Sequence, residues 1–249
     1  MNDPLTWQPS LLGWTADAGI DASFSKMTRI ELDDRSWLDL APGWVSGADQ
    51  LFEELVETAD WQQRTRHMYD KVVAEPRLTA YWHASGGAPL EPPVLESMRE
   101  SLSRRYGTEF DSAGLNLYRD GRDSVAWHRD RIAREIAEPI VVLVSLGHSR
   151  KLLVRPHGGG RSRSFLLGAG DLLATGGRFQ REWEHSVPKV AAAGPRISIA
   201  FRHGMVPKSY GEPDGGRRAG SRGGPLPEDT GRGRIPESTR VGPIVRATG

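Results

Sequence analysis

The sequence contains no cysteine. This excludes disulfides, thiolate zinc sites, iron–sulfur clusters and cysteine nucleophiles, so any metal must be held by His, Asp or Glu. No apolar run reaches the roughly 18 residues that a membrane helix needs. The start of the chain also lacks the basic segment and following apolar segment of a secretory signal. We therefore expect a cytoplasmic, monomeric protein with no membrane partner.

An excess of charge is also missing: 33 Lys and Arg stand against 32 Asp and Glu, a net charge of +1. Bulk charge therefore identifies no partner. Glycine and proline are instead concentrated in residues 208–249, which hold ten Gly and five Pro. This stretch has too little apolar surface to offset the entropy of ordering it. We predict a mildly basic, disordered tail rich in Gly, Arg and Pro.

The rest of the chain divides into an N-terminal extension over 1–47 and a folded domain over 48–207. Amphipathic patterns predict helices over 48–60 and 91–106, within a region of helices and lid over 48–110. A β-rich core over 111–207 follows. Its short strands are expected over 115–118, 140–146, 151–155, 164–167, 171–174, 185–187 and 196–201. Strands at this spacing are typical of a sandwich or barrel.

One short motif in the β-rich part has metal-binding character. His128 and Asp130 are two residues apart, so in a strand both side chains project from one face, about 6–7 Å apart along the backbone. His185 is the candidate third ligand. Two His and one carboxylate form the facial triad of non-haem Fe(II) oxygenases, which leaves coordination positions open. The alternative is that His128 and Asp130 belong to a charged strand without function. None of the remaining histidines has a carboxylate two residues further along the chain; they are His67, His83, His148, His157 and His203.

A second pattern concerns anions. In the strand expected over 196–201, Arg196 and Arg202 share one face, while Ile197, Ile199 and Phe201 share the other. If the arginines face a barrel lumen, they need anions, and a dicarboxylate would supply them. Asn116 and Tyr118 likewise share a face. Each pattern alone is also compatible with ordinary strand positions and solvated arginines.

Taken together, N-x-Y, H-x-D, a distal His and R-x5-R resemble the AlkB family of Fe(II)- and 2-oxoglutarate-dependent dioxygenases over roughly residues 60–205. The resemblance implies a mainly β fold of the α+β class, a double-stranded β-helix (jelly roll) with flanking N-terminal helices and a lid, so that 48–207 is the dioxygenase domain. It implies that Fe(II) is bound by His128, Asp130 and His185. It further implies that 2-oxoglutarate is bound by Asn116, Tyr118, Arg196 and Arg202, with Arg202 near the metal end supporting Asp130 and the proximal carboxylate.

The resemblance also implies the chemistry, with Fe(II), 2-oxoglutarate and O2 as cofactors and cosubstrates. The expected reaction is oxidative demethylation of 1-methyladenine and 3-methylcytosine in DNA or RNA, releasing formaldehyde, succinate and CO2. The target base must be flipped out or single-stranded. Trp82 is the expected stacking residue, with Tyr81 as the alternative and Arg77 beside them; core packing is the competing role for either aromatic.

Two basic clusters could contact nucleic-acid phosphates. They comprise Arg119, Arg122, Arg129, Arg131 and Arg134, and then Arg150, Lys151, Arg155, Arg161 and Arg163.

One departure from the family pattern leaves the substrate open. Several family members that act on nucleic acid carry a carboxylate just after H-x-D, whereas Arg131 and Ile132 follow Asp130 here, and the next carboxylate is Glu135. Two other functions therefore stay open. One is the same oxygenase chemistry on a small molecule or a protein side chain, and the other is a jelly-roll binding module without turnover.

Overall fold

The computed structural model describes residues 5–7, 17–68, 71–130, 132–205 and 245–246. The predicted tail therefore lies almost entirely outside the described residues. Its described part, β17 (Val245–Arg246), pairs in parallel with β1 (Thr6–Trp7). No helix within the described ranges is long and apolar enough to cross a membrane.

The larger of two main sheets has seven antiparallel strands. Their order is β3 (Thr28–Glu31), β4 (Ser36–Ala41), β14 (Leu172–Gly177), β11 (Val141–Gly147), β16 (Arg196–Arg202), β9 (Ser112–Tyr118) and β8 (Leu78–His83). Most of β11, β14 and β16 is buried, in keeping with their Val-, Leu- and Ile-rich sequences.

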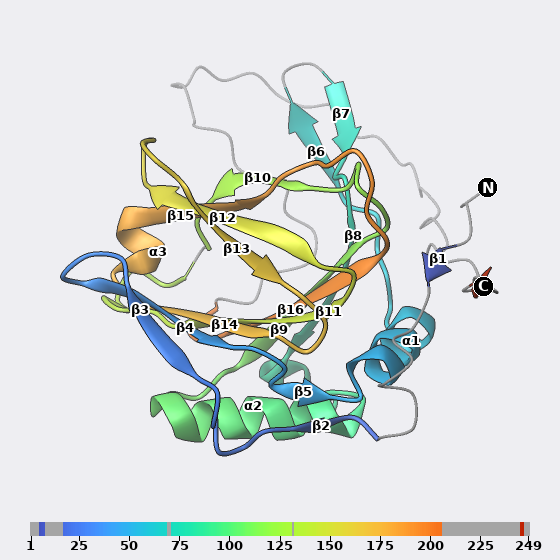
Figure 1. Ribbon diagram of the computed structural model, residues 1–249, viewed down its shortest axis with the longest axis horizontal. Coiled ribbons are helices and arrows are strands. Elements are labelled where there is room, and N and C mark those ends of the chain that lie inside the picture. Colours follow the sequence, from blue (N-terminus) through green and yellow to red (C-terminus); the bar gives the residue numbers. More distant parts are fainter. Residues whose placement is uncertain (1–4, 8–16, 69–70, 131, 206–244, 247–249) are drawn as a thin grey trace, which may run out of the picture.

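The smaller main sheet has four antiparallel strands. Their order is β10 (Val125–His128), β15 (Trp183–Val187), β12 (Arg150–Pro156) and β13 (Arg163–Leu167). Figure 1 shows this sheet facing the larger one, with the short helix α3 (Phe179–Glu182) at one end of the pair.

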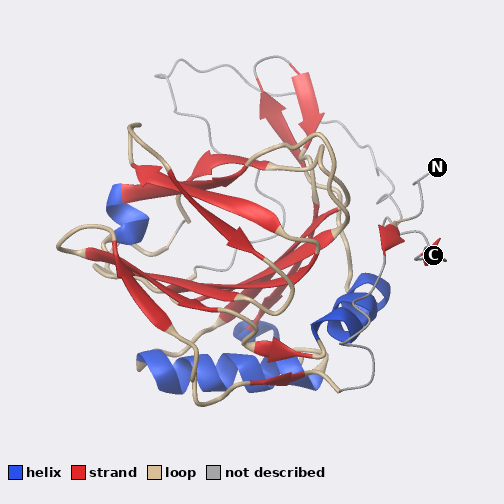
Figure 2. Ribbon diagram, viewed as in Figure 1, coloured by secondary structure: helices blue, strands red, loops and turns tan. Residues whose placement is uncertain are grey.

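Two hydrophobic clusters hold these layers together. The first lies on the outer face of the larger sheet, where α1 (Ala48–Thr58) and α2 (Pro93–Tyr106) pack against alternate strand residues such as Leu117 and Ile199. The second joins the inner faces of the two sheets and includes Leu143, Val154 and Phe179. Figure 2 shows both long helices on one side of the paired sheets. Alternate residues of one strand therefore pack either against the outer helices or between the two sheets.

The remaining elements are short. β2 (Gly19–Ile20) pairs with β5 (Val45–Ser46), and β6 (Thr65–Met68) forms a hairpin with β7 (Lys71–Ala74). The 3-10 turn η1 (Ala84–Gly86) follows β8.

The two facing antiparallel sheets with outer helices form the predicted jelly roll, and both predicted helices and all seven predicted strands are present within a few residues. The N-terminal region differs from expectation. Residues 28–31 and 36–41, placed in the extension over 1–47, form β3 and β4 and pair with the core strand β14. Strand β4 is mostly buried there, so this part of the chain belongs to the larger sheet.

Candidate functional site

His128, Asp130 and His185 come together at the smaller sheet. His128 lies at the end of β10, directly opposite His185 of β15 in the strand register. The centroids of the two imidazole rings are 4.2 Å apart. Asp130 lies two residues beyond the end of β10, rather than within a strand as predicted. Its Oδ2 nevertheless lies 3.7 Å from Nε2 of His185, because the chain turns inward after His128.

The pKa shifts of His185 and Asp130 favour cation binding. Burial and the neighbouring His128 lower the pKa of His185 to about 4, so its ring is neutral at pH 7. Burial alone would raise the pKa of Asp130, but the positive charge of Arg202, with the two histidines, lowers it to about 2. Nδ1 of His128 lies 2.9 Å from the carbonyl of Ala126; since a carbonyl only accepts, Nδ1 is the donor, and Nε2 is the ring nitrogen left to face a metal ion.

Two neighbours hold Asp130, one at its carboxylate and the other at its backbone N–H. Nε and Nη2 of Arg202 lie 2.8 and 2.7 Å from Oδ1. The backbone N–H of Asp130 donates to Oε1 of Gln180 at 2.9 Å, and Gln180 in turn donates to Thr175. Sequence reasoning identified Arg202 but missed Gln180, since a single Gln in a short helix carries no recognisable signal.

The donor chemistry of the trio fits Fe(II). Within the described residues, no group of three or more His, Cys, Asp and Glu side chains is already arranged to hold a metal ion. The buried Oδ2 of Asp130 and Nδ1 of His185 nevertheless have no hydrogen-bond partner, and Oδ2 faces the ring of a neutral histidine. Buried acceptor atoms of this kind are normally satisfied, and two imidazoles with one carboxylate are the ligands of non-haem Fe(II).

The inner face of the larger sheet carries the candidate anion site. Arg196 is 1% exposed, and its Nε donates to Oγ of Ser145 at 2.9 Å. Burial lowers the pKa of Arg196, and its Nη1 has no hydrogen-bond partner. Tyr118 lies against this guanidinium, 5.4 Å from ring centroid to Cζ. A buried guanidinium with an unused donor requires an anion, and a carboxylate of 2-oxoglutarate matches it.

Asn116 lies on the same face, one cross-strand position from Arg196. It stands opposite Ser198 in the register, and its Oδ1 accepts a hydrogen bond from Nε of Arg77 at 2.9 Å. Arg77 also forms an ion pair with Glu75 at 2.9 Å. Arg77, predicted to contact substrate, thus positions Asn116 and is already neutralised by a carboxylate.

The aromatic assignment needs a correction. Trp82 pairs with Ala113 and packs toward the helices, and its Nε1 donates to the carbonyl of Ala88. Tyr81, the next residue back, pairs with Gly114 and therefore faces inward. A Cβ built on Gly114 would lie 2.8 Å from Nη1 of Arg202 and 3.9 Å from the ring of Tyr81. Tyr81, at 38% exposed, is thus the aromatic on the side of the metal trio.

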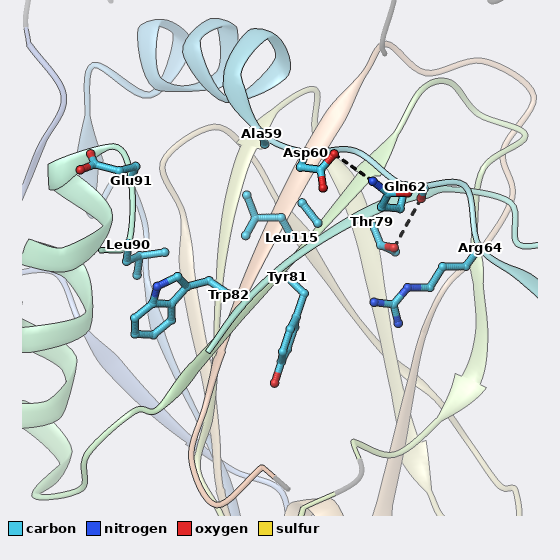
Figure 3. A pocket seen from close by; sticks show the side chains of 11 residues that line it. Ala59, Asp60, Gln62, Arg64, Thr79, Tyr81, Trp82, Leu90, Glu91 and Leu115 are labelled. Atoms are coloured by element: carbon cyan, nitrogen blue, oxygen red, sulfur yellow. Dashed lines mark hydrogen bonds between the residues drawn. The ribbon is translucent and has the colours of Figure 1, made fainter. Parts of the chain in front are cut away.

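Figure 3 shows that the two aromatic side chains point in different directions: Trp82 lies beside Leu90, and Tyr81 points away from Leu90. A shallow pocket of about 170 Å³ follows this edge of the sheet, lined by residues that include Asp60, Gln62 and Arg64. None of the metal trio lines it.

The two predicted basic clusters do not form one free surface. Arg119, Arg122 and Arg155 form ion pairs with Asp123, Asp120 and Glu184 at 2.6–2.8 Å, and Arg150 is 3% exposed. Arg131 lies outside the described residues. The remaining members that are exposed are Arg129, Arg134, Lys151, Arg161 and Arg163.

Comparison with known proteins agrees with this geometry. Residues 40–202 match the model of the 2OG-Fe(II) oxygenase superfamily. The chain is 32% identical over 195 residues to human alpha-ketoglutarate-dependent dioxygenase alkB homolog 3, covering 70% of this chain and 68% of the relative. The bovine protein of that name is 33% identical over 184 residues, covering 66% and 64%. The chain thus spans about two thirds of the length of these curated relatives.

Further relatives extend the comparison. DNA oxidative demethylase ALKBH2 of Arabidopsis thaliana is 29% identical over 190 residues, covering 61% of this chain and 60% of that protein. A solved structure titled "The structure of OsALKBH1" has a TM-score of 0.50 at 14% identity, covering 70% of this chain and 99% of that one, which supports the fold. The chain belongs to the AlkB family of the 2OG-Fe(II) oxygenase superfamily, and is a 2-oxoglutarate-dependent dioxygenase by that membership.

Proposed function

We propose that this protein removes methyl groups from ring nitrogens of damaged bases in nucleic acid, with 1-methyladenine and 3-methylcytosine as substrates in DNA or RNA. The observation that carries the proposal is the position of Tyr81, an exposed aromatic on the inner side of β8 next to Arg202, which holds Asp130. A flipped base needs such a stacking surface close to the reacting centre. Support also comes from the relatives named as DNA oxidative demethylases.

In the proposed reaction, one oxygen atom of O2 enters succinate as 2-oxoglutarate loses CO2, and the other is inserted into a C–H bond of the N-methyl group. The resulting N–CH2OH then breaks its N–C bond, giving formaldehyde and the N–H base. Fe(II), when bound by His128, Asp130 and His185, would supply the activation of O2.

The protein's own residues would do the positioning. Arg196 would hold the distal carboxylate of 2-oxoglutarate by charge-assisted hydrogen bonds, with Tyr118 and Asn116 beside it. Arg202 keeps the carboxylate of Asp130 ionised and oriented, and Gln180 holds the backbone N–H of Asp130. Phe179 of the second hydrophobic cluster lies beside the ring of His185, with 6.1 Å between the ring centroids.

The second residue after the H-x-D motif is buried. Ile132 is 6% exposed and packs in the second cluster, away from a bound base. We expect an acceptor for the exocyclic amine on another element. The segment after α1 that pairs with β8 carries Asp60 and Gln62, which line the same pocket as Tyr81 and offer acceptors there.

The proposal is tested by measuring succinate and formaldehyde with Fe(II), ascorbate and 2-oxoglutarate. Methylated oligonucleotides are supplied as single and double strands of DNA and RNA, and an unmethylated oligonucleotide of the same sequence is the control. We expect formaldehyde in amounts equal to the additional succinate, from the methylated strands only.

Succinate without formaldehyde from any methylated strand would contradict the nucleic-acid substrate and favour a small molecule or a protein side chain. Binding of iron without any consumption of 2-oxoglutarate would favour the binding module.

A further inference from the structure

A second buried arginine lies beside the proposed 2-oxoglutarate site. Arg150 begins β12 and is 3% exposed. Neither the predicted ligand set nor the mechanism above uses it. In sequence it resembles one member of a surface basic cluster, but its side chain points into the protein.

The contacts of Arg150 are unusual for a buried cation. Its Nη1 donates to the carbonyl of Asp120 at 3.1 Å, and its Nη2 donates to the carbonyls of Asp123 and Pro188 at 2.9 and 2.7 Å. In the described residues it forms no hydrogen bond to a carboxylate, since Asp120 and Asp123 are paired with Arg122 and Arg119. Its Nε is buried without a partner.

These contacts tie together two segments that border the site. Asp120 and Asp123 lie in the turn between β9 and β10, which separates Tyr118 from His128. Pro188 directly follows β15, which carries His185. One side chain therefore joins the turn after the proposed cosubstrate strand to the end of a proposed metal-ligand strand.

The guanidinium also reaches Tyr118. Its Cζ lies 5.7 Å from the centroid of the Tyr118 ring, and Cζ of Arg196 lies 5.4 Å from the same centroid. Two buried guanidiniums thus share one phenol ring. Carbonyl dipoles compensate a buried positive charge only in part, so the field of Arg150 reaches an anion bound at Arg196.

We infer that Arg150 is a positioning and specificity-determining residue for the cosubstrate: it holds Tyr118 in place and makes the site select 2-oxo acids that carry a second carboxylate. This inference rests on the proposed 2-oxoglutarate site. Arg196 is the direct partner of the distal carboxylate, and Arg150 acts through Tyr118 and through its charge.

The test compares two ligands of equal chain length, 2-oxoglutarate and 2-oxopentanoate, which lacks the distal carboxylate. Dissociation constants are measured by tryptophan fluorescence on the full chain loaded with Mn(II), so no turnover is needed. The variants are R150M and R150K. The matched control R122M removes a neighbouring arginine that pairs with Asp120 of the same turn.

We expect wild-type protein and R122M to bind 2-oxoglutarate more tightly than 2-oxopentanoate. In R150M this preference should fall at least tenfold, mainly through weaker binding of 2-oxoglutarate. R150K keeps the charge and should keep the preference within about threefold of wild type.

An R150M variant that keeps the wild-type preference within twofold would overturn the inference, as would equal weakening of both ligands, which is the result of a merely structural role. If R150M fails to fold, the preference of R150Q decides by the same criteria. Wild-type protein that fails to bind 2-oxoglutarate would overturn the proposed function and the inference with it. Normal preference in wild type with unchanged preference in R150M would overturn the inference alone.

Discussion

The two faces of the larger sheet are built from the same strands but behave in opposite ways. On the outer face, Leu117 and Ile199 are fully buried under the helices. On the inner face, alternate residues of the same strands are Asn116, Arg196 and Arg202, and one of them has an unsatisfied donor. The outer face therefore supplies stability and the inner face supplies binding groups, at a spacing of one residue.

The largest effect on activity without an effect on stability is expected when a proposed metal ligand is removed. H128A removes one proposed ligand while leaving its partly exposed surroundings intact. We expect succinate production to fall at least about 100-fold, with little change in the melting temperature. Coupled succinate and thermal measurements on the same preparation check this. Retained turnover would remove His128 from the metal site.

The reverse experiment uses the outer face. I199A leaves a cavity in the first cluster and should cost roughly 2–5 kcal/mol of unfolding free energy. The activity per folded molecule should stay near that of wild type, because no inner side chain changes. Urea unfolding measures the unfolding free energy, and turnover at low temperature measures the activity per folded molecule. A selective loss of 2-oxoglutarate binding in I199A would show that the faces are coupled.

The aromatic pair at β8 sharpens the comparison within two adjacent residues. Base stacking is worth roughly 1–3 kcal/mol, so Y81A should slow demethylation of a methylated oligonucleotide by about five- to 140-fold and spare turnover of 2-oxoglutarate without substrate. W82A should instead lower the melting temperature. If instead W82A slows demethylation and Y81A lowers the melting temperature, the inward position of Tyr81 has no role in substrate binding.

The smallest effect concerns a polar residue next to the outer face. His203 accepts a hydrogen bond from the backbone N–H of Ile140 at 2.9 Å and touches Phe110. Burial lowers the pKa of His203. Below pH 6.5 this side chain is therefore protonated to a greater extent in the unfolded chain than in the folded chain. Stability should therefore fall as the pH drops below 6.5, by at most about 1.4 kcal/mol per pH unit. H203Q should show a shallower slope in urea titrations across this window; identical slopes would contradict the assignment.

Local patterns were enough to predict the core strands and a sandwich or barrel, and the resemblance to the AlkB family supplied the jelly roll. The alternation in residues 196–202 and the runs of Val and Leu over 140–146 predict strands because both side-chain period and composition agree there. Strands β3 and β4 were missed. β3 is mostly exposed and lacks an apolar face, and β4 is defined by its pairing with β14, far along the chain.

The site shows the same limit. The spacing of His128 and Asp130 predicted that they meet, although Asp130 does so from beyond the strand. The choice between Tyr81 and Trp82 depends on the register with β9, which no local pattern contains. Ser145, the partner of Arg196, could have been noticed as the one polar side chain in an apolar strand. Arg150 looked like a surface residue because its carbonyl partners come from two distant turns.

Strand β10 has a consequence for local opening of the protein. It lies at the edge of the smaller sheet and, within the part of the chain that the structure describes, is paired along one side only, with β15. Edge strands open more readily than central ones. An ion held by His128 and His185 would cross-link the edge strand to its neighbour at the one register position where both side chains meet. Amide hydrogen exchange over Val125–His128 should therefore slow when Mn(II) is added, while exchange in the central strand β11 stays the same. The concentration of the metal ion would then determine how often β10 opens, and therefore how fast a protease degrades the protein.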